Sequence, residues 1–134
     1  MSKRTGRGMT ESQFTKYFCD RLKKVNALVL VLSGGNNLQQ SGLPDRYVCH
    51  TRFRGWIEFK KDQYALQEHQ RAICEGLSER GDTVIVCRYS HLGMISLRRV
   101  GGKNEIVLDV RDIMGGTDPE VGLKLLSSLS AVAQ

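Results

Sequence analysis

The sequence predicts a single α/β domain in which a helix, three strands, a second helix and a fourth strand follow one another, with a hairpin and a last helix added at the C-terminal end. Three observations predict it. Apolar residues recur at helical spacing behind a capping box in residues 10–26. Residues 45–60 have the pattern of two strands joined by a tight turn, and residues 83–87 form an apolar run typical of a buried strand. With 134 residues, 40% of them hydrophobic, the chain is long enough for one core and too short for a separate recognition module.

The first helix and the first strand meet at a boundary that the sequence leaves open. The helix is expected to end near Asn26, and the apolar residues Ala27 to Leu32 follow directly. This run fits a first, buried strand, and it also fits a last helical turn followed by a strand. The segment from Ser33 to Asn37 is rich in glycine and asparagine and breaks the pattern. It lacks the Gly-Lys-Ser/Thr ending of a phosphate-binding P-loop, so we expect a turn there.

A second helix is predicted after the hairpin. Its apolar residues recur at helical spacing from Tyr64 to Leu77. Gly81 is suited to the C-terminal cap of this helix, because glycine adopts the left-handed conformation without a steric cost. The buried strand at residues 83–87 follows at once.

The C-terminal third of the chain is expected to extend this core. Residues 94–100 and 105–110 read as two strands on either side of Gly101-Gly102, and residues 121–132 as an apolar helix. The leucines of this last helix exceed the evident needs of one small core. A homodimer interface and packing back over the sheet are the two uses that we expect for them.

Two acidic residues are predicted to meet in the hairpin. Side chains alternate along a strand, so Glu58 and Lys60 share one face while their apolar neighbours occupy the other. If the turn is centred on Thr51-Arg52, Asp45 lies directly opposite Glu58. Like charges in that position destabilise a sheet, and a divalent cation would compensate. Carboxylate oxygens suit Mg²⁺ or Mn²⁺, and Lys60 adds a positive charge beside the metal.

These residues, taken in order, resemble a known family. Gly42-Leu43-Pro44-Asp45, a short hairpin, Glu58-Phe59-Lys60 and a helical Gln70 resemble the PD-(D/E)XK nuclease superfamily, and within it the virus-type replication-repair nuclease (VRR-NUC) domains, in the stand-alone form found in some bacteriophages. The resemblance spans Glu11 to Arg88. It implies a restriction-endonuclease-like αβββαβ core with a mixed central sheet.

The resemblance also implies roles for the acidic pair and its neighbours. Asp45 and Glu58 would be metal ligands, helped by the main-chain carbonyl of Phe59, and Lys60 would be the catalytic lysine. The alternative interpretation of Glu58 and Lys60 is an ordinary exposed strand face with a weak surface charge pattern. For Asp45 the alternative is a turn residue after Pro44.

Two further residues match the family less specifically. Gln70 matches a glutamine on the following helix that contacts the attacking water or a backbone phosphate; otherwise it is a solvated helix residue. Glu11 matches an extra acidic residue of the metal site; otherwise it is a first-turn residue that favours the helix dipole.

The charge of the chain points to a polyanionic partner. Its formal net charge is +6. Between Asp45 and Lys61 the only acids are the two proposed ligands. Basic residues surround them in the sequence and are expected to bind nucleic acid, with salt-sensitive affinity. Besides Lys60, they are Arg46, Arg52, Arg54 and Lys61.

Together these features predict a Mg²⁺- or Mn²⁺-dependent endodeoxyribonuclease that hydrolyses phosphodiester bonds in branched DNA, including Holliday junctions, and acts as a homodimer. One alternative is a sequence-specific, restriction-like endonuclease with base contacts from the Arg98-Arg99 segment and the C-terminal helix. Another is a nucleic-acid-binding protein without catalysis.

The location of the protein is predicted from features that the sequence lacks. Residues 1–9 are expected to be a basic, disordered tail ahead of a single domain at residues 10–134. No apolar run behind the tail resembles a signal peptide or reaches the length of a membrane span. We therefore expect a cytoplasmic protein, in the host cytoplasm if phage-encoded. The four cysteines form no zinc pattern with the three histidines and are expected to be reduced, with Cys19, Cys74 and Cys87 as small core residues.

Overall fold

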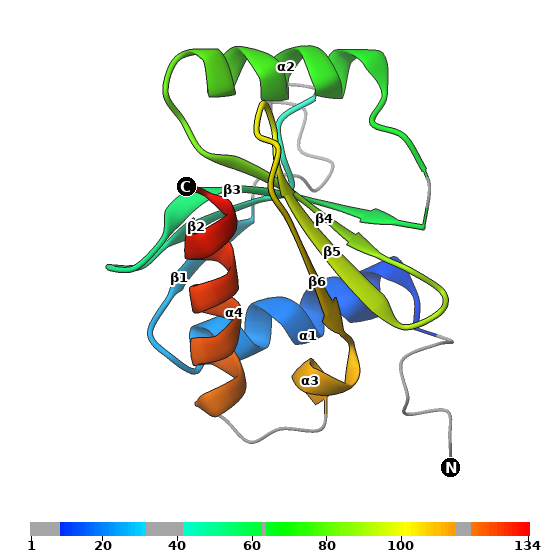
Figure 1. The fold of residues 1–134 in the computed structure, drawn as a ribbon, viewed down its shortest axis with the longest axis vertical. Coiled ribbons are helices and arrows are strands. Elements are labelled where there is room, and N and C mark those ends of the chain that lie inside the picture. The colour runs from blue at the N-terminus through cyan, green and yellow to red at the C-terminus, as the bar shows by residue number, and fades with distance from the viewer. Residues whose placement is uncertain (1–8, 32–41, 63, 115–118) are drawn as a thin grey trace.

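The computed structural model describes residues 9–31, 42–62, 64–114 and 119–134 (Figure 1). The expected tail at residues 1–8 and the turn at Ser33 to Asn37 lie outside the described residues. The order of helices and strands agrees with the predicted one except for a short additional helix (Arg111–Met114) between the last strand and the last helix. In chain order the elements are α1 (Glu11–Lys23), β1 (Leu28–Val31), β2 (Arg46–Cys49), β3 (Arg54–Lys61), α2 (Glu68–Glu79), β4 (Val84–Tyr89), β5 (Met94–Arg99), β6 (Glu105–Asp109), α3 (Arg111–Met114) and α4 (Glu120–Val132).

The six described strands form one mixed sheet in sequential order from β1 to β6. All neighbours are antiparallel except β3 and β4, which run parallel. A parallel pair needs a crossover connection, and α2 provides it. Helix α2 lies on one face of the sheet, and α1 and α4 lie on the other (Figure 1).

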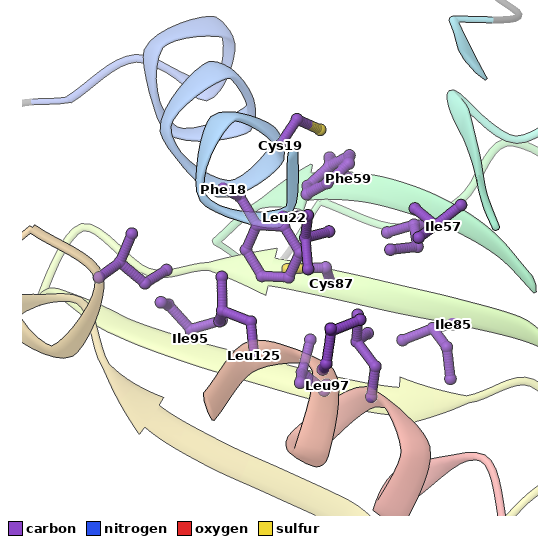
Figure 2. Close-up of a cluster of buried hydrophobic side chains, with 14 of the residues drawn as sticks. Phe18, Cys19, Leu22, Ile57, Phe59, Ile85, Cys87, Ile95, Leu97 and Leu125 are labelled. Carbon is purple, nitrogen blue, oxygen red and sulfur yellow. The ribbon is translucent and has the colours of Figure 1, made fainter. Parts of the chain in front are cut away.

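The hydrophobic core lies between the sheet and the helices α1 and α4 (Figure 2). Phe18 from α1, Phe59 from β3 and Leu125 from α4 are almost fully buried there. Helices α1 and α4 approach closely at Gly122, where an added Cβ would lie 2.4 Å from the main-chain oxygen of Arg21. Met9, which the sequence places in the tail, is buried in this core.

Strand β1 differs from the buried strand that the sequence allowed. Leu28 and Val31 are each 58% exposed and Leu30 is 44% exposed. The reason is its position, because β1 forms an edge of the sheet. Only Val29 packs against the core.

Helix α2 begins four residues later than predicted. Tyr64 is not helical, and Gln67 remains extended (φ −66°, ψ 158°) as the residue before the first turn. The Gln70 side chain accepts the main-chain N–H of Gln67 at 3.0 Å and fixes the start of the helix there. The predicted end is confirmed: Gly81, with φ +100°, follows the helix.

The last helix packs back over the sheet. Five of its apolar residues are buried against α1 and the neighbouring strands, and Leu123 is its one exposed large hydrophobic residue among those described. The buried ones are Val121, Leu125, Leu126, Leu129 and Val132. Most of the apolar residues of this helix are therefore used in the core, and dimerisation stays a prediction.

The three cysteines that the sequence places in the core are buried there. Cys19, Cys74 and Cys87 are buried free thiols, and Cys49 is half-buried. Burial raises the pKa of Cys19 and of Cys74 to about 11. In the part of the chain that the structure describes, no helix combines the length and hydropathy needed to cross a membrane.

Candidate active site

The β2–β3 hairpin has the register that the sequence predicts. Arg46 pairs with Ile57 and Cys49 with Arg54. The turn between the strands is closed by His50 and Phe53, whose main chains exchange hydrogen bonds of 2.8 and 3.2 Å. Extending this register by one residue places Asp45 opposite Glu58.

Hydrogen bonds to the main chain hold Asp45 and Glu58 side by side. The Asp45 N–H donates to Glu58 Oε1 at 3.1 Å, and the Phe59 N–H donates to Asp45 Oδ2 at 3.0 Å. Each carboxylate is thus fixed by the backbone of the other strand. In an antiparallel strand the N–H and C=O of one residue point to the same neighbour, so the Phe59 carbonyl lies on the Asp45 side of β3. Two carboxylates and a carbonyl therefore face one location.

The loop before Asp45 passes directly beneath α2. Gly42 has φ +93°, and an added Cβ would lie 2.9 Å from the main-chain oxygen of His69. Only glycine fits both the backbone conformation and this close approach. Pro44 then fixes the chain direction into β2. The Gly-Leu-Pro-Asp sequence thereby delivers Asp45 to the end of β2, next to the first turn of α2.

Glu58 is a buried carboxyl group in an unfavourable electrostatic environment. It is 2% exposed. Burial and the nearby charge of Asp45 raise the pKa of Glu58 to about 7. The positive charge of Lys60 and the hydrogen bond from the Asp45 N–H lower this pKa, but their combined effect is smaller. Lys60 Nζ lies 4.0 Å from Glu58 Oε2. A further positive charge at the pair would favour the ionised form, and this is the environment expected of a cation site.

Gln70 reaches the site from α2. Its Oε1 accepts the Gln67 N–H, which orients the amide so that Nε2 faces Glu58 Oε2 at 3.4 Å. The structure therefore brings Gln70 to the acidic pair rather than leaving it as a solvated helix residue. Its catalytic role remains a prediction.

Glu11 lies near the pair at the first turn of α1. Partial burial and the charge of Asp45 raise the pKa of Glu11, while Lys60 and Lys61 lower it. Both interpretations of Glu11 are thus compatible with its place. Within the described ranges, however, no group of three or more His, Cys, Asp and Glu side chains is arranged to hold a metal. The donor set that fits is Asp45, Glu58 and the Phe59 carbonyl, which suffices for Mg²⁺ because that ion keeps several waters.

The basic residues do not surround the acids as the sequence suggests. Lys60 and Lys61 follow Glu58 on the same strand, but Arg54 lies four residues before it, roughly 13 Å away at the usual strand rise. Arg52 lies farther still, in the turn. Arg46 pairs with Ile57, whose face is the core face, and its guanidinium donates to the Asp45 carbonyl at 3.1 Å. Lys60 therefore lies beside the acidic pair, whereas Lys61 lies on the opposite face of β3, and nucleic-acid binding by Lys61 and the arginines stays a prediction.

Sequence reasoning missed Arg88 on β4. The parallel register places it beside Lys60. Its guanidinium donates to the main-chain oxygen of Tyr64 at 2.6 Å and to that of Asp62 at 3.4 Å. Alternation along β4 predicts the face of Arg88, but the sequence contains no signal for the parallel register.

The Arg98-Arg99 pair, considered for base contacts, is divided between two environments. The Arg99 guanidinium donates to the main-chain oxygen of Ala133 at 2.6 Å, at the end of α4. Arg98 is exposed. Only one of the two arginines is thus available to a ligand.

Comparison with known proteins identifies the fold. No protein-family model matches the chain, and no curated protein matches it. Among solved structures it is similar to Hjc, a Holliday junction resolvase from the archaeal hyperthermophile Archaeoglobus fulgidus, with a TM-score of 0.52 and 14% sequence identity over 83% of this chain and 98% of that chain. The chain therefore has the restriction-endonuclease-like fold that the sequence predicts.

Proposed function

We propose that this protein is a metal-dependent nuclease that hydrolyses phosphodiester bonds in DNA, and that it prefers branched substrates such as Holliday junctions. The observation that carries the proposal is the Asp45–Glu58 pair: two carboxyl groups fixed side by side, one of them buried with a raised pKa, and Lys60 4.0 Å away. The preference for branched DNA is supported by the structural similarity to a Holliday junction resolvase. The proposal extends to a cytoplasmic homodimer of the VRR-NUC type.

The donor set fits Mg²⁺ or Mn²⁺. Asp45, Glu58 and the Phe59 carbonyl would hold the ion, which supplies an activated water and neutralises charge on the phosphate. The burial of Glu58 keeps bulk water away from this carboxylate and so strengthens its electrostatic interactions.

The ammonium group of Lys60 is the positive charge that this chain supplies to the substrate phosphate. Lys60 is only 17% exposed, and its ammonium group lies beside the acidic pair, where it can donate hydrogen bonds to a non-bridging oxygen of the scissile phosphate. Such a fixed donor stabilises the charge that develops on phosphorus oxygens in the transition state.

Gln70 orients Glu58. Its oxygen is committed to the Gln67 N–H, so its NH₂ group donates to Glu58 Oε2 and limits rotation of that carboxylate. A carboxylate held in one orientation keeps its other oxygen directed at Asp45, as the hydrogen bond from the Asp45 N–H also requires.

The test is cleavage of a panel of linear duplex, single strand, flap and four-way junction with Mg²⁺, Mn²⁺ or EDTA. We expect metal-dependent cutting, fastest on the junction, and a loss of at least about a hundredfold in Glu58→Ala, the scale of one essential electrostatic group. Glu75→Gln, an exposed acid on α2, is the matched control and should cut like the wild type. Absence of cutting on every substrate, or unchanged cutting by Glu58→Ala, would contradict the proposal.

A further inference from the structure

A groove opens on the same face of the sheet as Lys60, beside α2. Its volume is about 1040 Å³, at the upper limit of ordinary small-molecule pockets. Its lining consists of Asp62 and Tyr64, residues of β4 and β5, and the Gly101-Gly102 turn. The groove is thus open enough for an extended chain rather than one small ligand.

The groove lies beside the candidate active site on the sheet. Lys60 on β3 is paired with Arg88 on β4, and Arg88 with Ser96 on β5. Arg88 and Ser96 both line the groove. Neighbouring strands lie about 4.8 Å apart, so this row leads from the lysine into the groove within about 10 Å. A polymer bound at the acidic pair can therefore continue along the groove.

The charges of the groove are almost balanced, and one cation is available. Asp62 accepts hydrogen bonds from His91, whose Nδ1 lies 2.9 Å from Oδ1, and Glu105 accepts one from the Ser96 hydroxyl. Both carboxylates are therefore occupied. Arg98 is exposed, lines the groove, and makes no hydrogen bond or ion pair with any described residue.

Apolar and aromatic side chains of the groove are unusually exposed. Tyr64 is 69% exposed and Leu92 63%. The main chain that carries Tyr64 is held in place, because its carbonyl accepts the 2.6 Å hydrogen bond from Arg88. The ring is thus presented from a fixed backbone.

The side chains of the groove fit an unpaired strand better than a duplex. Duplexes are bound mainly through many cations on phosphates, and this groove has a near balance of charge. Unpaired strands are bound by stacking of bases on aromatic rings with few phosphate contacts, which is what Tyr64 and Arg98 offer. We infer that the groove binds an unpaired stretch of the nucleic-acid strand next to the scissile bond, with a base stacked on Tyr64 and a phosphate on Arg98. The link to a scissile bond rests on the proposed function; the binding itself does not.

The test is the fluorescence anisotropy of labelled oligo(dT), oligo(rU) and a duplex of the same length, titrated with the full chain in EDTA. The wild type should bind single strands more tightly than duplex. Tyr64→Ala should weaken single-strand binding about tenfold, the effect of one lost base stack. Tyr64→Phe keeps the aromatic ring and should bind single strands as tightly as the wild type. Arg98→Ala should lower the slope of log affinity against log salt concentration by about 0.7. Lys23→Ala, an exposed cation on α1, is the charge-matched control and should bind like the wild type.

Two results would overturn the inference: single-strand affinity unchanged in both Tyr64→Ala and Arg98→Ala, or wild-type protein that prefers duplex. Because metal is absent, these results do not depend on catalysis. If the wild type cuts the substrate panel but neither substitution changes single-strand affinity, strand binding in the groove is disproved and the nuclease activity stands. If the substitutions weaken single-strand binding but no substrate is cut, strand binding in the groove stands and the nuclease activity is disproved.

Discussion

The two faces of strand β3 both bury side chains, but one contributes to the hydrophobic core and the other to the acidic pair of the candidate active site. On one face Ile57 and Phe59 are sealed beneath α1, and Phe59 makes edge-to-face ring contacts with Phe18 at 5.4 Å. On the other face Glu58 is as deeply buried, yet its neighbours are Asp45 and Lys60. Burial stabilises the fold on the first face, whereas on the second it places a carboxyl group where its charge is unfavourable. Substitutions on the two faces should therefore change stability in opposite directions.

The largest effect is expected on the core face. Phe18→Ala removes a fully buried ring that contacts both Phe14 and Phe59. It should lower the free energy of unfolding by about 3 to 5 kcal/mol, measured by urea denaturation. A loss below 1 kcal/mol would mean that this face is not the principal core.

The opposite sign is expected for Glu58→Gln in EDTA. The pKa of Glu58 is raised from 4.5 to about 7 on folding, so the folded state binds the extra proton between those values. Stability of the wild type should therefore fall as pH rises from 5 to 8, by up to about 3 kcal/mol. Glu58→Gln should remove most of that dependence and be the more stable protein at pH 8. Parallel pH profiles of the two proteins in urea denaturation would contradict the electrostatic account.

Two glycine substitutions sharpen the comparison between the helix layers. Gly122→Ala in α4 places a Cβ 2.4 Å from the Arg21 carbonyl oxygen and should destabilise the protein by about 2 kcal/mol. Gly76→Ala in α2 meets only the Arg80 side chain, at 3.4 Å, and should stabilise it by about 0.5 to 1 kcal/mol. Thermal unfolding of both variants measures the difference. Equal shifts would mean that α4 is not closely packed on α1.

The smallest effect on stability is expected at Gln70. Gln70→Glu keeps an oxygen for the residue 67 N–H, but it replaces the donor to Glu58 by a carboxylate and so adds a negative charge beside the acidic pair. Stability should change by about 1 kcal/mol or less at pH 7, because Glu58 can take up a proton in response, while junction cleavage should fall about tenfold, because Glu58 is no longer oriented and is more often protonated. Gln67→Ala is the control for the start of the helix: it changes the side chain at the helix cap but keeps the main-chain N–H of residue 67 and the Gln70 side chain that accepts it. Equal losses of cleavage in the two variants would show that Gln70 acts only through the helix.

Local rules predicted the hairpin well. The length of the turn and the alternation of side chains fix which residues oppose each other, so the sequence alone predicts that Asp45 lies opposite Glu58. The same register places Arg46 opposite Ile57, on the core face. The hairpin pattern therefore also indicates that the Arg46 side chain lies on the opposite face of the sheet from Glu58.

Non-local pairing limited the rest. The exposure of β1 depends on strand order, and the position of Arg88 beside Lys60 depends on a parallel register set by the α2 crossover. Neither is encoded in a short pattern. The late start of α2 was missed because glutamine is not a preferred helix cap, so Gln67 gave no signal.

The most direct test of the account is a calorimetric titration of the metal-free protein with Mn²⁺ at pH 8. We expect the wild type to bind Mn²⁺, Asp45→Asn and Glu58→Gln to lose this binding, and Glu75→Gln to retain it. Equal binding by the wild type and by the two site variants would show that Mn²⁺ is held elsewhere and would contradict the assignment of Asp45 and Glu58 as metal ligands.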